Sequence, residues 1–343
     1  MRAALVGFLI AAGCGSGTAV SQTSSGVAAP TYAPPAGQER ASRVASADAI
    51  PASEDERERL LYLRAGSVWA MEADGAEDNQ ITVRASAAPD LDPAFGLGGA
   101  FAFSSARDGV SKIYVSTLEE GVSRAITSGA DGGDREPAWS PDSKRIVFVR
   151  GDPHVQRDLY IVELDTGDIT PLLEGKDDHP DNTGAPAWSP DGKTIVFSAD
   201  RRASQGTLLY LVGADGSNLR RLTAPRQGAW FLHDRKPAWS PDGKTVAFAS
   251  NRHVSSGDHA ADFDIYTVGS DGSDVLQLTE DPGVADDPTY SPDGKRIFFA
   301  STRDAKNAYE IEIYVMPAVG GDKRRMTRDE QPQNSAPSAG RTQ

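Results

Sequence analysis

Two segments of the sequence gather side chains that could hold a divalent cation, because imidazole and carboxylate groups are common ligands of such ions. In chain order these side chains are Asp177, Asp178, His179, Asp181 and Asn182 in the first segment, and His253, Asp258, His259 and Asp262 in the second. Their spacing matches no metal-binding motif, and solvated acidic loops are expected on an acidic protein. We therefore predict no metal site, with bound Ca²⁺ or another divalent ion as the alternative.

The sequence lacks the motifs of nucleophilic and phosphate chemistry. It contains no Gly-x-Ser-x-Gly nucleophile elbow and no Gly-rich loop that follows a strand and opens a helix. Its single cysteine, Cys14, excludes a disulfide framework and a cysteine-rich zinc module. We expect a non-enzymatic protein without a cofactor. The alternative is a metal-assisted polysaccharide lyase or hydrolase built on the His and Asp loops.

Charge and composition narrow the class of partner. The chain has 343 residues, with 35 Lys and Arg against 49 Asp and Glu, a net charge of −14. A protein that follows nucleic-acid phosphates needs a basic face, so we predict no nucleic-acid binding. The 34 Gly and 22 Pro residues suit a turn-rich fold. No apolar run approaches the roughly 20 residues of a membrane-spanning helix.

A repeat of about 50 residues fills most of the chain. Its copies begin at Pro93, Pro137, Pro186, Pro237 and Pro288, the last four of them with Pro-x-Trp/Tyr-Ser-Pro-Asp. Each copy continues with an apolar segment that ends in Phe, an Ile-Tyr or Leu-Tyr pair, and a short final run. The Ser-Pro-Asp-Gly and Asp-Gly sequences favour tight turns. One repeat therefore predicts four short antiparallel strands, with the repeat proline as first residue of the first strand.

A four-stranded sheet of this kind has two apolar faces and cannot bury them alone. Stacking the copies around an axis buries both faces, which predicts an all-β protein, a β-propeller of four-stranded antiparallel blades. The aromatic residues of successive first strands are expected in the core between blades: Phe95, Trp139, Trp188, Trp239 and Tyr290. Ion pairs or caps within blades are expected from Asp90, Asp134 and Asp234, before the repeat prolines, and from Arg107, Arg252 and Arg303, after the second strands.

The pattern Pro-x-Trp-Ser-Pro-Asp-Gly-Lys, followed by apolar-Phe, Ile-Tyr and Leu-Thr segments, resembles the TolB-type, WD-like propeller repeat of bacterial envelope proteins. The resemblance covers roughly residues 60–327. It implies the propeller fold and an envelope location, but says less about activity, because functional sites are grafted onto shared folds. TolB carries a folded α/β domain before its propeller. This chain has a low-complexity segment there, so the resemblance implies a relative of TolB.

The number of blades follows from counting strands. Residues 60–82 match the second to fourth strands of a unit with no first strand before them, which makes six sets of later strands and five first strands. Pro337 continues the spacing of the repeat prolines. We predict six blades, the first closed by a short strand from the C-terminal segment. The expected domains are a signal peptide (1–13), a disordered tether (14–56) and the propeller (57–343).

The N-terminal segment resembles a bacterial export signal. Arg2 precedes a short apolar stretch that closes on Ala11-Ala12-Gly13-Cys14, similar to a lipoprotein lipobox, although such boxes usually carry Leu in place of Ala11. Residues 15–56 hold too few large apolar side chains to fold. We expect lipidation at Cys14 and a tether that anchors a monomer to the outer membrane in the periplasm, with a secreted or periplasmic protein as the outcome without lipidation.

The lengths of the loops predict which face binds a partner. One face carries the short repeated turns, and we call it the tight-turn face. The opposite face carries the loops between second and third strands and the links between blades, and we call it the long-loop face. All five histidines fall there, and so does an aromatic pair of the type that anchors interfaces. We expect a protein or peptide of the cell envelope to bind near Trp230, Phe231, His179, His233 and His253. A purely structural spacer module is the third alternative.

Overall fold

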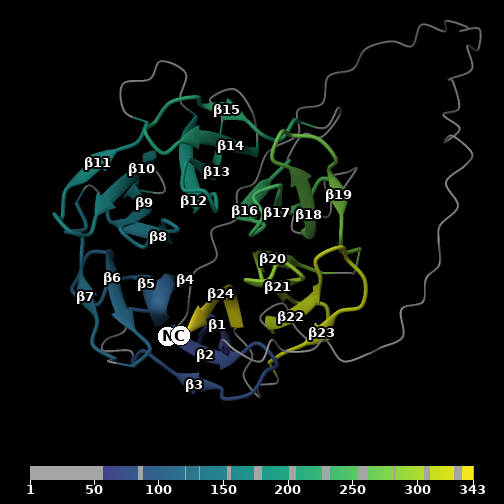
Figure 1. Ribbon diagram of the computed structural model, residues 1–343, viewed down its shortest axis with the longest axis horizontal. Coiled ribbons are helices and arrows are strands. Elements are labelled where there is room, and N and C mark those ends of the chain that lie inside the picture. The colour runs from purple at the N-terminus through teal and green to yellow at the C-terminus, as the bar shows by residue number, and fades with distance from the viewer. Residues whose placement is uncertain are drawn as a thin grey trace, which may run out of the picture. The chain divides into compact units, whose positions relative to one another are not determined.

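The computed structural model describes residues 57–83, 88–119, 121–130, 132–152, 156–173, 180–200, 206–225, 232–253, 262–280, 283–304, 310–327 and 334–342. These residues form six four-stranded antiparallel sheets arranged in a ring (Figure 1). The predicted six-bladed β-propeller is therefore confirmed. The signal peptide (1–13) and tether (14–56) expected from the sequence lie outside the described residues. Within the described ranges, no helix is long and apolar enough to cross a membrane.

Each blade runs from an inner strand beside the ring axis to an outer strand at the rim. From inside to outside, blade 1 contains β24 (Asn334–Thr342), β1 (Arg57–Arg64), β2 (Ser67–Glu72) and β3 (Asn79–Gln80). Blade 2 contains β4 (Asp90–Phe95), β5 (Ala100–Ser105), β6 (Lys112–Thr117) and β7 (Arg124–Ala125), with the 3-10 turn η1 (Leu97–Gly99) after β4. Blade 3 contains β8 (Asp134–Trp139), β9 (Arg145–Asp152), β10 (Gln156–Glu163) and β11 (Ile169–Pro171).

The remaining blades follow the same order. Blade 4 contains β12 (Asp181–Trp188), β13 (Thr194–Asp200), β14 (Thr207–Gly213) and β15 (Arg220–Arg221). Blade 5 contains β16 (Asp234–Trp239), β17 (Thr245–Ser250), β18 (Asp264–Gly269) and β19 (Leu276–Gln277). Blade 6 contains β20 (Ala285–Tyr290), β21 (Arg296–Ser301), β22 (Glu312–Pro317) and β23 (Arg324–Arg325).

The C-terminal segment closes blade 1, as the strand count predicted. β24 pairs antiparallel with β1 along its length, with one β-bulge in the register. The prediction of a short strand was wrong, because β24 contains nine residues. Its small residues fit a crowded position: a Cβ atom on Gly340 would lie 2.5 Å from Phe95 Cγ of blade 2. A strand rich in Ser, Ala and Gly is therefore able to complete the ring.

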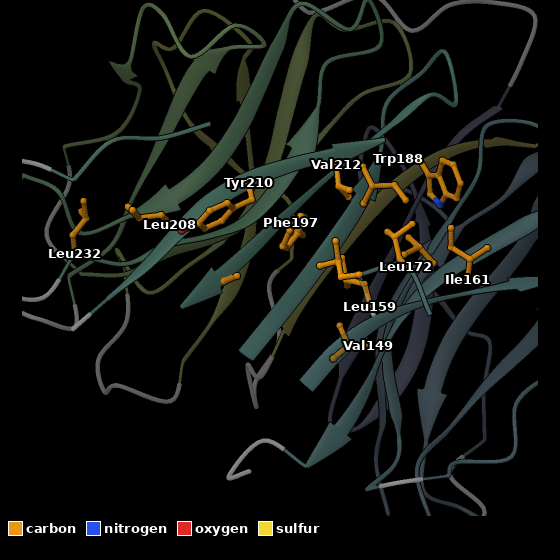
Figure 2. Close-up of a cluster of buried hydrophobic side chains, with 14 residues drawn as sticks. Val149, Leu159, Ile161, Leu172, Trp188, Phe197, Leu208, Tyr210, Val212 and Leu232 are labelled. Atoms are coloured by element: carbon orange, nitrogen blue, oxygen red, sulfur yellow. The ribbon is translucent and has the colours of Figure 1, made fainter. Parts of the chain in front are cut away.

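The hydrophobic core lies between adjacent blades. The middle strands carry nearly continuous runs of apolar residues, and successive side chains of a strand point to opposite faces of the sheet. Both faces of each sheet therefore pack against a neighbouring blade. Between blades 3 and 4, Leu159 and Ile161 of β10 share one buried cluster with Trp188 and Phe197 of blade 4 (Figure 2). Phe197 also stacks on Tyr210 across the blade, with ring centroids 5.8 Å apart. This places Trp188 in the core, as the repeat predicted.

The Ser-Pro-Asp-Gly turns adopt the conformation expected from their sequence. Gly243 in the turn of blade 5 has a φ of 70°, in the left-handed region that glycine favours. The carboxylate of Asp242 accepts hydrogen bonds from Ser240 Oγ (2.7 Å) and from the backbone N–H of Lys244 (3.1 Å). The hydrogen bond from Ser240 lowers the pKa of Asp242 below its ordinary value. The local sequence alone accounts for this turn.

Each inner strand contains a β-bulge that the sequence did not reveal. Five of these strands begin three residues before the repeat proline and β12 begins five before it, so the prediction of proline as first strand residue was wrong. The residue before the proline has a left-handed backbone, with φ between 46° and 53° in all six blades. We call these the bulge residues, and they are Asp92, Glu136, Ala185, Lys236, Asp287 and Ala336. A bulge redirects the side chain that it carries.

The aspartates before the repeat prolines form ion pairs inside the blades, as predicted. Asp90 pairs with Arg107 and Asp234 pairs with Arg252, each at 2.6 Å. The arginines also lie over the Phe–Tyr pairs of their own blades. Blade 6 has no aspartate at that position, and there Arg303 lies over its aromatic pair. These charged residues support the fold and are separate from the site described next.

Candidate functional site

A pocket of about 620 Å³ opens on the long-loop face. Its walls come from the beginnings of β12, β14 and β16 and from the end of β13, with Glu136 and Arg157 of blade 3 on one side. Phe263 and Val284, which directly precede β18 and β20, form an apolar part of the wall. The pocket therefore joins side chains from four consecutive blades.

Charged bulge residues meet at the centre of the ring beside this pocket. Lys236 Nζ lies 3.8 Å from Oδ1 of Asp92 and 3.6 Å from Oδ1 of Asp287. Lys236 belongs to β16 and Asp92 to β4, and these strands stand on opposite sides of the ring (Figure 1). The Lys236–Asp92 pair therefore crosses the propeller axis, and Lys236 also lines the pocket.

The acidic bulge residues connect neighbouring blades. The backbone N–H of Ala185 in blade 4 donates a hydrogen bond to Glu136 Oε2 in blade 3, at 2.5 Å. The backbone N–H of Ala336 in blade 1 donates to Asp287 Oδ2 in blade 6, at 3.2 Å. The bulge geometry exposes these N–H groups, and a carboxylate on the preceding blade satisfies them. Acidic side chains at this position thus have a packing role of their own.

The surrounding carboxylates keep Lys236 charged. Burial lowers the pKa of Lys236, but Asp287, Glu136 and Asp92 together raise it above its ordinary value. Burial raises the pKa of Asp92, and Lys236 opposes that shift. The centre of the propeller is consequently held together by a lysine shared among several carboxylates.

A second ion pair clamps blade 5 to blade 6 at the pocket wall. Arg235 Nη2 and Nε donate hydrogen bonds to Asp286, at 2.6 Å and 3.2 Å. The Arg235 guanidinium also lies 3.6 Å from the ring centre of Phe263. Burial and the adjacent Asp287 raise the pKa of Asp286 to about 6, against the lowering effect of Arg235. Arg235 is therefore held by Asp286 and Phe263.

His233 is the sequence-predicted binding residue that the structure places in the pocket. Its Nδ1 lies 3.1 Å from Thr207 Oγ1, and its backbone N–H donates to Asn251 Oδ1 at 2.8 Å. Burial lowers the pKa of His233 below its ordinary value. The imidazole is neutral at pH 7 and can donate or accept a hydrogen bond.

His253 does not join His233 in the pocket. Its Nδ1 lies 3.3 Å from Asp264 Oδ2, and Asp264 also accepts a hydrogen bond from Thr279 Oγ1 at 2.6 Å. His253 is thus bound to its own blade. Asp262 is described, but no group of three or more His, Cys, Asp or Glu suited to a metal ion occurs within the described ranges.

Several predicted residues cannot be placed. Those that lie outside the described residues are Cys14, Asp177, Asp178, His179, Trp230, Phe231, Asp258 and His259. Conversely, sequence reasoning missed Arg157, Arg235 and Lys236. Two of them, Arg235 and Lys236, occupy the two positions before the repeat proline, where residue types vary although the flanking motif repeats, and this variation is a signal that could have found them.

The tight-turn face has a pocket of its own, of about 430 Å³, with a different character. It is lined by the five aromatic residues of the inner strands and by small residues such as Ala94. Trp139 Nε1 donates to the Ala94 carbonyl at 3.1 Å, which fits the predicted packing role. Among the described residues, no charged side chain lines this pocket, whereas a larger one of about 980 Å³ on the same face, between blades 4 and 5, is lined by Asp191, Lys193 and Arg220 among others.

Comparison with known proteins agrees with this architecture. An uncharacterized protein of Agrobacterium fabrum is 32% identical over 201 residues, which cover 56% of this chain and 57% of that protein. An uncharacterized peptidase of Bacillus subtilis is 26% identical over 216 residues, which cover 52% of this chain and 31% of the peptidase. The chain thus spans only part of these curated relatives.

A solved structure and a family model complete the comparison. The crystal structure of TolB from Acinetobacter baumannii matches with a TM-score of 0.65 at 21% identity, over 82% of this chain and 66% of TolB, which shows a shared fold. The TolB beta propeller domain model matches residues 59–233 and 232–341. Since these matches span more than half of the chain, it belongs to the TolB β-propeller domain family.

Proposed function

We propose that this protein is a non-enzymatic binding protein whose propeller holds a protein or peptide partner on its long-loop face. The observation that carries the proposal is the pocket of about 620 Å³, in which polar side chains from consecutive blades converge beside an apolar wall. Concave sites with a few convergent polar groups on a rigid scaffold are typical binding sites. Lys236, Asp92 and Asp287, which interact across the axis, add charged groups that such a ligand can contact.

Capture of partners from cell-envelope extracts tests the proposal. Immobilised protein is expected to retain a defined envelope protein, and the variant Asn182→Ala/His233→Ala is expected to retain less of it, because both side chains line the pocket. Lys244→Glu is the control on the tight-turn face, where the side chain is 79% exposed. Trp230→Ala/Phe231→Ala tests the sequence-based candidates in the same assay. A loss confined to Lys244→Glu contradicts the chosen face, and metal-dependent cleavage of a polysaccharide supports the enzyme alternative.

We also propose that the protein is anchored in the cell envelope through Cys14. The support is the short apolar segment that ends at the only cysteine, together with the family match to TolB propellers. Cys14→Ser is expected to move the protein from the membrane fraction to the soluble periplasmic fraction, with its thermal unfolding unchanged. Fractionation and mass spectrometry of the mature N-terminus measure this. A mature chain that starts after Cys14 contradicts lipidation.

A further inference from the structure

Arg157, at the beginning of β10, lines the pocket without an acidic partner among the described residues. Its side chain is partly buried, and its Nε is fully buried with no hydrogen-bond acceptor in the described part of the chain. The other cations of the pocket are already engaged. Arg235 is bound to Asp286, and Lys236 lies among the central carboxylates.

The Arg157 guanidinium therefore has at least one hydrogen-bond donor that no described residue satisfies. A buried donor without an acceptor costs free energy, and because Arg157 lines the pocket, a ligand there can approach its guanidinium. The planar guanidinium fork matches the two oxygens of a carboxylate, and such charge-assisted pairs are among the stronger hydrogen bonds of proteins. The chemistry of Arg157 therefore favours a carboxylate.

Gly184 of β12 lies beside Arg157 at a position with little room for a side chain. A Cβ atom at this position would lie 3.2 Å from Glu136 Oε2, 3.5 Å from Ser198 Oγ and 3.9 Å from Arg157 Nη2. The same position, two residues before the repeat proline, carries Leu91, Arg135, Arg235, Asp286 and Ser335 in the other blades. Only blade 4 has a glycine there, so a larger residue would crowd the Arg157 side of the pocket.

The rest of the pocket suits a peptide that carries a carboxylate. Glu136 already accepts the Ala185 N–H and contributes to the field around Lys236. Neutral His233 offers a hydrogen-bonding group, and the partly exposed Val284 offers an apolar surface for an aliphatic side chain. Because the chain carries a net charge of −14, long-range attraction cannot supply the affinity for an acidic ligand, and the local guanidinium has to do so.

We infer that Arg157 binds a carboxylate of the partner, from either a C-terminus or an Asp or Glu side chain inserted into this pocket. The inference rests on the proposed binding function of the long-loop face. To that proposal it adds a carboxylate as the group on the partner and Arg157 as the residue that binds this carboxylate.

Short peptides test this inference on the full chain. The probes are acetyl-Ala-Ala-Leu with a free carboxylate, its C-terminal amide, and acetyl-Ala-Glu-Leu amide, with binding followed by saturation-transfer NMR and calorimetry. The wild type is expected to bind one or both acidic probes and not the neutral amide. Binding of the free-acid probe alone identifies a C-terminal carboxylate as the source, and binding of the Glu probe identifies a side chain.

Variants with matched controls separate binding from folding. Arg157→Ala is expected to weaken binding of the acidic probe by about 10- to 100-fold, and Arg157→Lys to restore part of it, since Lys keeps the charge without the fork. Gly184→Leu, which introduces the residue of blade 2, is expected to weaken binding, because the added side chain would crowd Glu136 and Arg157. Arg124→Ala, at an exposed arginine on the outer strand of blade 2, is the control and should bind like the wild type.

Three results overturn the inference: no binding of either acidic probe to the wild type at about 10 mM, equal binding of the neutral amide, or equal binding by Arg157→Ala and the wild type. These results are distinguishable from failure of the proposed function. If Arg157→Ala still captures the envelope partner while Asn182→Ala/His233→Ala does not, the binding face stands and the carboxylate contact is wrong. If the wild type captures no partner, the proposed function itself fails.

Discussion

Removal of residues 334–343 is expected to abolish cooperative folding of the propeller. β24 pairs with β1 over seven residue pairs and is the inner strand of blade 1. At about 1 kcal/mol for each net hydrogen bond, the lost pairing alone is comparable with the about 5–15 kcal/mol that stabilises a typical domain. Leu60 and Leu61 of β1, both fully buried, would also lose their cover on the inner side of the blade.

Calorimetry of the truncated and full-length chains measures this effect. The truncated chain should show no sharp unfolding transition, and much of it should aggregate through the unpaired edge of β1. Gly340→Val is a milder variant of the same test, because its Cβ would meet the Phe95 ring at 2.5 Å. It should lower the unfolding temperature without abolishing the transition. A truncated chain that melts cooperatively near the full-length temperature would show that blade 1 does not need its C-terminal strand.

Asp134→Ala is expected to lower the free energy of unfolding by about 3–5 kcal/mol, because it breaks a buried ion pair by removing one partner only. The Asp134 side chain is fully buried and accepts hydrogen bonds from Arg150 Nε at 2.7 Å and Nη2 at 3.1 Å. It also accepts the backbone N–H of Gly129 at 3.0 Å. The Arg150 guanidinium is held over the Phe148 and Tyr160 rings, so it cannot turn to water without loss of packing.

Denaturant unfolding of matched variants tests the mechanism. Asp134→Ala/Arg150→Met removes both charges and should recover much of the lost stability, since a buried pair can often be replaced by apolar residues. Lys244→Ala breaks an ion pair whose side chains are 79% and 57% exposed, and should cost at most about 1 kcal/mol. If Asp134→Ala costs no more than Lys244→Ala, the buried pair is not a source of stability.

The sequence by itself determined the architecture. The Pro-x-Trp-Ser-Pro-Asp repeat predicted four-stranded blades, and the unpaired strands at residues 60–82 predicted closure by the C-terminal segment. Both are confirmed. Turns such as Ser240–Gly243 are also readable, because their hydrogen bonds join residues that are adjacent in the chain. A periodic pattern records local turns and alternating burial, which are the features that define a blade.

The site was decided by the tertiary structure. Lys236 and Asp92 belong to blades on opposite sides of the ring and meet only because the ring closes and each bulge redirects one side chain. Arg157, Gly184 and Glu136 likewise come from three different strands. In the sequence each of them occupies an ordinary repeat position, and no short spacing links them. Contacts across the axis depend on the number of blades and on the geometry of the bulges. Neither can be predicted from the sequence immediately around a single site residue.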